Sequence, residues 1–188
     1  MLVSIVAFGF TKCQPVMLRS QEGFEYLSGE DSLSRKMLYG SFVGCSGLSL
    51  APLLAAYGSL NPFLIPTALL TTTTICAGAA TYAYYKPKGS MLKLGGPLMG
   101  GLMALILLQL SSLGATYFYG PNMFSLMAHR ADLYLGTGLF TALVAYDTHV
   151  AIGEYEAGNP DALGSAISMV LNFQNIFVRM LEILKNWE

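Results

Sequence analysis

A lone carboxylate in apolar surroundings is the feature of this sequence that is best suited to chemistry. Asp147 lies in the run Ala145–His149, toward the end of a long apolar segment. In such surroundings a carboxylate must be paired, be protonated or line a wet cavity. Two interpretations stay open: a group that senses protons or cations, or a carboxylate at a helix end that is bonded to nearby backbone or hydroxyl groups.

A polar stripe is predicted in the last apolar segment. Asn172 and Asn175 are three residues apart and Arg179 follows four residues later, so all three lie on one helix face. Exposing this stripe to lipid would be costly, and it is therefore expected to face Asp147 or a hydrated path. Buried amides also serve as hydrogen bonds between membrane helices, and this alternative stays open for the two asparagines.

No familiar catalytic arrangement accompanies these groups. The cysteines, Cys13, Cys45 and Cys76, are scattered without metal-ligand spacing, which favours buried free thiols. His129 and His149 are predicted at opposite membrane faces, whereas a catalytic zinc site generally needs about three protein ligands. Neither a Gly-x-Ser-x-Gly elbow nor a phosphate-binding loop occurs. We therefore expect no enzyme activity, no metal and no cofactor.

The composition indicates an all-α integral membrane protein. Apolar residues make up 54% of the chain, charged residues only 11%, and the mean hydropathy is +0.53. Soluble domains carry about 25% charged residues. With a net charge of −1 and no basic run, nucleic acid is not an expected partner. A spanning helix needs about 20 apolar residues, and five full spans are predicted, over 37–57, 62–85, 94–119, 132–152 and 162–184.

The remaining segments define the predicted organisation and orientation. Residues 1–11 are predicted to be a partial helix, the end of a span that begins outside this chain; a short interfacial or buried segment is the alternative. Residues 12–36 are predicted to be a loop, followed by a single five-helix bundle over 37–188. Basic residues cluster in the loops at 12–36 and 86–93, which places these loops in the cytosol together with the acidic loop at 154–161.

Several motifs in order resemble the transmembrane Bax inhibitor motif family, and within it a Bax inhibitor-one-like branch. The similarity is concentrated in Tyr146–Thr148, Gly158–Asp161 and Ala166–Arg179. It is supported upstream by Gly47–Pro52, Asn61–Ala68, Leu94–Gly96 and Ser111–Gly114, so that it covers about residues 37–186. The resemblance implies a seven-helix bundle wrapped around a central last helix. It also implies that a first helix and most of a second are missing here.

The resemblance assigns a role to the aspartate and to the stripe. In calcium-leak members of the family, two aspartates of the last two helices share a proton near the cytosolic side, and deprotonation opens the path. Asp147 matches the first aspartate, whereas Asn172 stands at the second. The pair is therefore expected to form one hydrogen bond and to have weakened or altered pH gating. Lys12 is a candidate for the family's basic partner, and Asn175 and Arg179 extend the stripe.

The leading functional expectation is a multi-pass cation-leak channel, or channel-like regulator, of endoplasmic reticulum calcium that suppresses programmed cell death under stress. Its implied partners are the lipid bilayer, calcium as the transported ion and apoptosis-related membrane proteins. The alternative is a non-conducting membrane scaffold that regulates apoptosis or stress signalling by binding partner membrane proteins. A membrane hydrolase is a third and weaker alternative, because the histidine positions argue against it.

Overall fold

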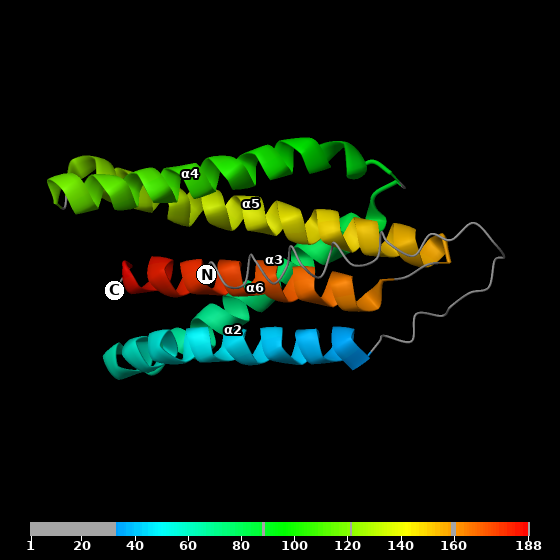
Figure 1. The fold of residues 1–188 in the computed structure, drawn as a ribbon, viewed down its shortest axis with the longest axis horizontal. Coiled ribbons are helices and arrows are strands. Elements are labelled where there is room, and N and C mark those ends of the chain that lie inside the picture. Colours follow the sequence, from blue (N-terminus) through cyan, green and yellow to red (C-terminus); the bar gives the residue numbers. More distant parts are fainter. Residues whose placement is uncertain (1–32, 88, 121, 159–160, 188) are drawn as a thin grey trace.

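The computed structural model describes residues 33–187 apart from residues 88, 121 and 159–160. The described part consists of helices and short connections, without strands, as the sequence predicts. The predicted partial helix at 1–11, the loop up to residue 32 and Lys12 lie outside the described residues. In chain order the helices are α2 (Leu33–Leu60), α3 (Leu64–Tyr85), the 3-10 turn η2 (Leu92–Leu94), α4 (Gly95–Tyr119), α5 (Met123–Glu156) and α6 (Ala162–Lys185) (Figure 1).

Five of these helices are long and apolar enough to cross a membrane, which confirms the predicted spans. The five differ in how much of their surface the protein itself covers. In the apolar stretch of α6, 50% of the residues are buried, against 33% in α5 and 11% in α2 and in α4. Apolar side chains that remain exposed on α2 and α4 are suited to contact with lipid tails. The last helix is thus the most buried span, as expected for a central helix.

Two helix starts differ from the sequence prediction. Helix α5 begins at Met123 instead of Asp132, so most of the connection between the predicted spans 94–119 and 132–152 is helical. Its start is fixed by a capping box, in which the Asn122 side chain accepts a hydrogen bond from the Ser125 backbone N–H (2.8 Å) and Ser125 Oγ accepts one from the Asn122 N–H. The start of α5 was predicted too late because His129 and Arg130 interrupt the run of apolar residues. Helix α2 likewise begins at Leu33, inside the predicted loop.

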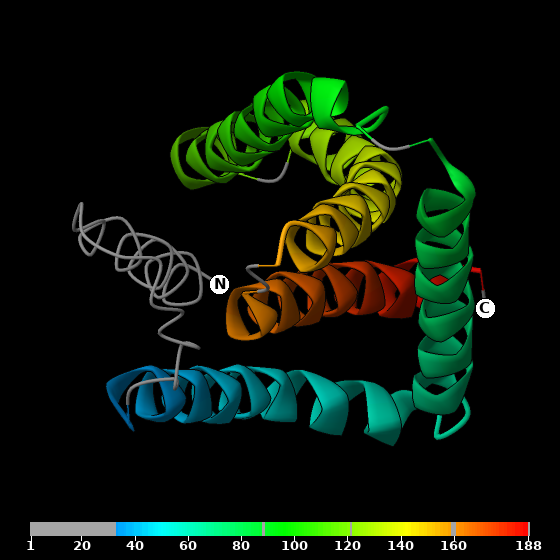
Figure 2. The same cartoon turned by 90° about the vertical axis from the view of Figure 1, so that its right-hand side faces the viewer.

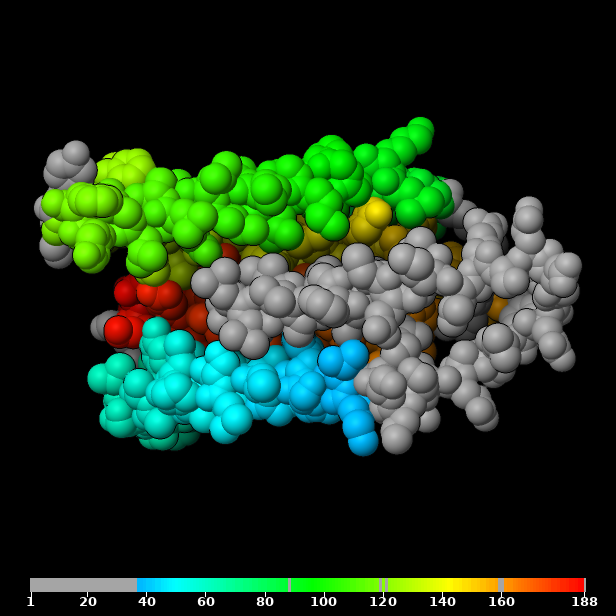
Figure 3. Space-filling view, in the orientation of Figure 1, coloured from blue at the N-terminus to red at the C-terminus, as the bar shows by residue number. Residues whose placement is uncertain are grey.

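Helix α6 packs against α5, α3 and α2, while α4 packs against the outer side of α5 (Figure 2). One apolar cluster, around Phe140 of α5 and Ile176 of α6, joins these two helices to α4. A second cluster, around Ala68 of α3 and Leu181 of α6, joins α6 to α3 and α2. On the face in Figure 3, α4 and α2 form separate flanks with part of α6 visible between them. Helices α2 and α4 therefore lie on opposite sides of the α5–α6 pair, and α3 packs against both α5 and α6.

A glycine allows α4 to approach α5 closely. A Cβ atom at Gly101 would lie 2.7 Å from Cδ1 of Leu139, a distance that real Cβ atoms do not show, whereas one at neighbouring Gly100 would meet nothing within 4 Å. Small residues are used in this way at contacts between membrane helices, where dispersion rather than water exclusion stabilises packing. Close approach of α4 to α5 therefore depends on Gly101, whereas Gly100 faces open space.

The loop between α3 and α4 lies beside the C-terminal half of α5. The backbone N–H of Gly89 donates a hydrogen bond to Nε2 of His149 (3.0 Å), and Nδ1 of the same ring lies 3.4 Å from the Ala83 carbonyl. The ring of His149 thus bridges the loop and the end of α3. This contact places the basic loop at 86–93 and the Asp147 end of α5 at the same end of the bundle (Figure 1), as the alternation of spans predicts.

Candidate functional site

A cavity of about 450 Å³ lies between α2, α4, α5 and α6. Most of its lining is apolar, but side chains that can bind ions or water enter it from all four helices. These polar lining residues are Ser46, Ser49, Gln109, Asp132, Asp147, Ser168, Asn172, Gln174, Asn175, Arg179 and Glu182. Four of them are ionisable, which is unusual between membrane spans and marks the cavity as the candidate site.

Asp147 and Asn172 meet across the α5–α6 contact. The side-chain amide of Asn172 donates a hydrogen bond from Nδ2 to Oδ2 of Asp147 over 2.8 Å. Asn172 is only 6% exposed, and Ser168, one turn earlier on α6, is also buried. An amide donor satisfies a carboxylate without a shared proton, unlike a second carboxylate at this position. The structure therefore brings together the two residues that the sequence singled out as the sensing pair.

Asn175 does not join this pair. Its side-chain nitrogen donates to the Leu171 carbonyl one turn back on its own helix (2.8 Å). Its backbone oxygen and side-chain oxygen lie 3.4 Å and 3.5 Å from Nη1 of Arg179. Asn175 thus supports the Arg179 side chain instead of the Asp147–Asn172 pair.

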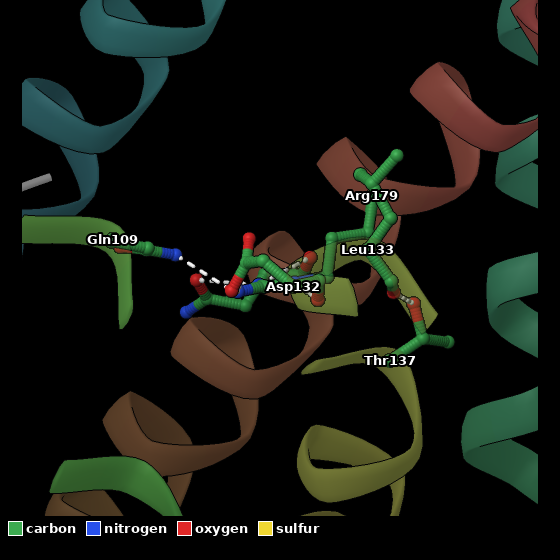
Figure 4. A network of polar contacts seen from close by, with 6 residues as sticks. Gln109, Asp132, Leu133, Thr137 and Arg179 are labelled. Atoms are coloured by element: carbon green, nitrogen blue, oxygen red, sulfur yellow. Dashed lines mark hydrogen bonds and ion pairs between the residues drawn. The ribbon is translucent and has the colours of Figure 1, made fainter. Parts of the chain in front are cut away.

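Arg179 has a partner that the sequence analysis did not identify. Its Nη2 lies 3.1 Å and 3.3 Å from the carboxylate oxygens of Asp132 on α5, and its Nε donates to the Asp132 backbone carbonyl (3.2 Å). Gln109 of α4 donates to the same carboxylate over 2.9 Å, so three helices meet at Asp132 (Figure 4). The side chains of Arg179 and Asp132 are 5% and 13% exposed. This is a buried, hydrogen-bonded ion pair.

The cavity therefore has two polar centres, Asp147–Asn172 and Asp132–Arg179. Their aspartates are fifteen residues apart on α5, which corresponds to about 22 Å along a helix axis. Asp132 was predicted only as the start of a span, and Gln109 was not among the predicted site residues. A signal was present, because Gln109 is the single amide or charged residue of α4, and an isolated amide there suggests a polar partner on a neighbouring helix.

The two histidines lie at opposite ends of α5, as predicted. His149 is held beside the α3–α4 loop, whereas His129 Nε2 lies 2.6 Å from Oε1 of Glu182 on α6. The His129 and Glu182 side chains are 50% and 30% exposed, so this contact lies at the periphery. The two imidazoles have different partners and do not form a joint site.

Potential metal ligands and thiols are scattered in the described part of the chain. No group of three His, Cys, Asp or Glu side chains there is close enough to hold a metal ion. Cys45 and Cys76 are free thiols, but Cys45 is exposed, contrary to the predicted burial, because it lies on an outward face of α2. Cys13 lies outside the described residues.

Five apolar spans, four of which line a cavity with two polar centres, define a multi-pass helical membrane protein. Over residues 1–188 the chain matches the family model described as "Inhibitor of apoptosis-promoting Bax1". The chain therefore belongs to the Bax inhibitor family, as its motifs suggested.

Individual relatives agree with this assignment. Human Bax inhibitor 1 is 34% identical over 157 residues, which are 84% of this chain and 63% of the relative. Bax inhibitor 1 of Drosophila melanogaster is 30% identical over 152 residues, 81% of this chain and 58% of the relative. An uncharacterised protein of Helicobacter pylori is 27% identical over 163 residues, 86% of this chain and 65% of that protein. The chain thus spans less than two thirds of the length of these relatives, and no solved structure matches it.

Proposed function

We propose that this protein forms a cation leak path, with calcium as the transported ion, in the endoplasmic reticulum membrane, and that it dampens cell death by this leak. The observation that carries the proposal is the Asp147–Asn172 pair on the wall of a cavity between the spans. The family is named for inhibition of apoptosis-promoting Bax1, and human Bax inhibitor 1 is among the relatives. Asp147 is proposed to face the cytosolic end, because the basic loop at 86–93 lies beside it.

The chemistry of the cavity wall suits a hard cation. Calcium binds carboxylate, amide and hydroxyl oxygens at 2.3–2.6 Å in flexible arrangements, and Asp147, Asn172 and Ser168 supply these three oxygen types from α5 and α6. Ser46 on α2 adds a buried hydroxyl that has no hydrogen-bond partner among the described residues. Buried polar groups of this kind are normally satisfied by water, which favours a hydrated path. We propose no enzymatic role and no cofactor.

A non-conducting scaffold is the second candidate. Two observations favour it: Asn172 replaces the carboxylate expected from the family resemblance, and the outer faces of α2 and α4 carry many exposed apolar side chains. Such faces are suited to partner membrane proteins as well as to lipid. In this reading the cavity pairs stabilise the bundle, and partner binding survives the loss of Asp147.

Removing the Asp147 carboxylate is expected to reduce calcium efflux from proteoliposomes to the level of protein-free vesicles. The variants are Asp147→Ala and, as a matched control, Thr148→Val. Thr148 is the next residue along α5, and its hydroxyl donates only to the Val144 carbonyl of its own helix (2.7 Å). The control is therefore expected to retain the efflux of the unmodified chain.

The two candidate functions give different results in this assay. Equal efflux from the unmodified chain and Asp147→Ala, or none above protein-free vesicles from a chain shown to be inserted and helical, would contradict the leak path. Recovery of the same partner membrane proteins by the unmodified chain and by Asp147→Ala would then support the scaffold.

A further inference from the structure

The second polar centre places a fixed positive charge in the same cavity as Asp147. Four ionisable side chains line this cavity: Asp132, Asp147, Arg179 and Glu182. Arg179 is the single cation among the described lining residues. A cation that enters past Asp147 and continues toward the His129 end of the bundle must pass the guanidinium of Arg179.

The guanidinium is held in place by Asp132, by the ring of Phe140 and by the space that Gly136 leaves for it. Asp132 binds it through the carboxylate and the backbone carbonyl. The ring of Phe140 lies 4.9 Å from Cζ of Arg179, within the range of a cation–π contact. Gly136 of α5 leaves the space that the guanidinium occupies, since a Cβ atom at this position would overlap Nε and Cζ. A charge fixed in this way acts on a passing ion without having to reorganise.

The balance between Arg179 and Asp132 sets the field that a passing cation meets. As a pair their charges offset each other, so removing either one changes the net charge of the cavity wall, which also carries Asp147 and Glu182, by one unit in a known direction. The electrostatic energy of an ion in a given potential is proportional to its charge. Calcium carries twice the charge of potassium. A substitution that multiplies the potassium flux by some factor should therefore multiply the calcium flux by about the square of that factor.

We propose that Arg179 and Asp132 determine the cation specificity of the leak, with Arg179 as the barrier and Asp132 as the charge that offsets it. This inference rests on the proposed leak function and adds the site that limits it. Gln109 tunes the pair, because its amide occupies part of the hydrogen-bonding capacity of Asp132.

Two single substitutions should shift the leak in opposite directions. Arg179→Gln leaves a carboxylate without its cation and is expected to raise calcium efflux several-fold, with a smaller rise for potassium. Asp132→Asn leaves a cation without its carboxylate and is expected to lower calcium efflux several-fold, with a smaller fall for potassium. The double variant Asp132→Asn/Arg179→Gln retains an amide pair without net charge and should return close to the parent values.

A third substitution avoids breaking the ion pair, in case a single variant does not fold. Gln109→Lys retains a donor toward Asp132 and adds one positive charge, so it should lower calcium efflux more than potassium efflux. Parallel proteoliposomes loaded with calcium or potassium give both fluxes, and circular dichroism verifies the helical content of each variant.

The outcomes separate this inference from the function on which it rests. If Arg179→Gln and Asp132→Asn change calcium efflux in the same direction, and the double variant loses still more efflux, the pair is structural. That result would overturn the specificity inference but not the leak function. Efflux that depends on Asp147 but is unchanged in Gln109→Lys would also overturn it. Absence of efflux from every folded variant would overturn the leak function and this inference together.

Discussion

Replacing Asn172 with aspartate is expected to make the leak strongly dependent on pH. In the unmodified chain the Asn172 amide donates to Asp147 over 2.8 Å, and this bond needs no proton from solution. Two carboxylates at this separation would share a proton at lower pH and repel each other once it is lost. Leak should therefore increase with pH, on the order of tenfold from about pH 6 to about pH 8, because coupled carboxylates interact by more than about one pK unit.

The matched control is the same substitution one turn further along the stripe. The Asn175 side chain contacts the Leu171 carbonyl and lies near Arg179, not Asp147. Asn175→Asp adds the same charge to α6 and is expected to leave the pH profile flat, since the carboxylate would lie beside a guanidinium. Calcium efflux from proteoliposomes at a series of pH values measures both variants. Calcium efflux from Asn172→Asp that does not change with pH, or equal pH slopes for Asn172→Asp and Asn175→Asp, would contradict the proposed role of the Asp147–Asn172 pair.

Removing Arg179 alone should destabilise the bundle strongly. In Arg179→Leu the buried Asp132 carboxylate keeps only its neutral donor, Gln109, and loses its cation. Breaking one side of a buried ion pair costs about 3–5 kcal/mol, whereas replacing both sides with apolar residues is often neutral. We therefore expect Arg179→Leu to lose about 3–5 kcal/mol of unfolding free energy and Asp132→Leu/Arg179→Leu to recover most of it.

Detergent-induced unfolding followed by circular dichroism measures these free energies. Lys185→Leu is the control, because Lys185 is an exposed cation at the end of the same helix whose Nζ lies 5.6 Å from the Tyr57 ring. Its loss should change stability by no more than about 1 kcal/mol. Two results would contradict a stabilising Asp132–Arg179 ion pair. One is a double variant whose loss of unfolding free energy equals the sum of the losses in Asp132→Leu and Arg179→Leu. The other is an Arg179→Leu variant as stable as Lys185→Leu.

The spans were predictable because a membrane imposes a strict length and composition on helices. The stretches without charge at 37–85 and 94–129 left few alternatives, and turns with Gly and Pro or charged loops separated the segments. The start of α5 was not predictable by this reasoning. The capping box at Asn122 and Ser125 is a local hydrogen-bond signal that outweighs the charged residues following it.

Part of the site was predictable for a similar reason. Spacing along α6 alone placed Asn172, Asn175 and Arg179 on one face, and the structure shows that this face meets α5. Sequence spacing could not say which carboxylate each residue meets, because that depends on how α5 curves against α6 (Figure 2) and on the reach of the arginine side chain. Asp132 was therefore missed, although its side chain is only 13% exposed and it binds the arginine of the stripe.

The proposed cation path is tested most directly by whether a water-soluble cation can reach the cavity. Ser168 lines the cavity one turn from Asn172, whereas Ala145 is equally buried but packs toward α3 and η2. Ser168→Cys and Ala145→Cys, each in a chain with Cys13, Cys45 and Cys76 replaced by serine, would be treated in proteoliposomes with a cationic, membrane-impermeant thiol reagent. A hydrated cation path predicts modification of Ser168→Cys with loss of calcium efflux, and no reaction at Ala145→Cys. Equal and negligible modification at both positions would contradict it.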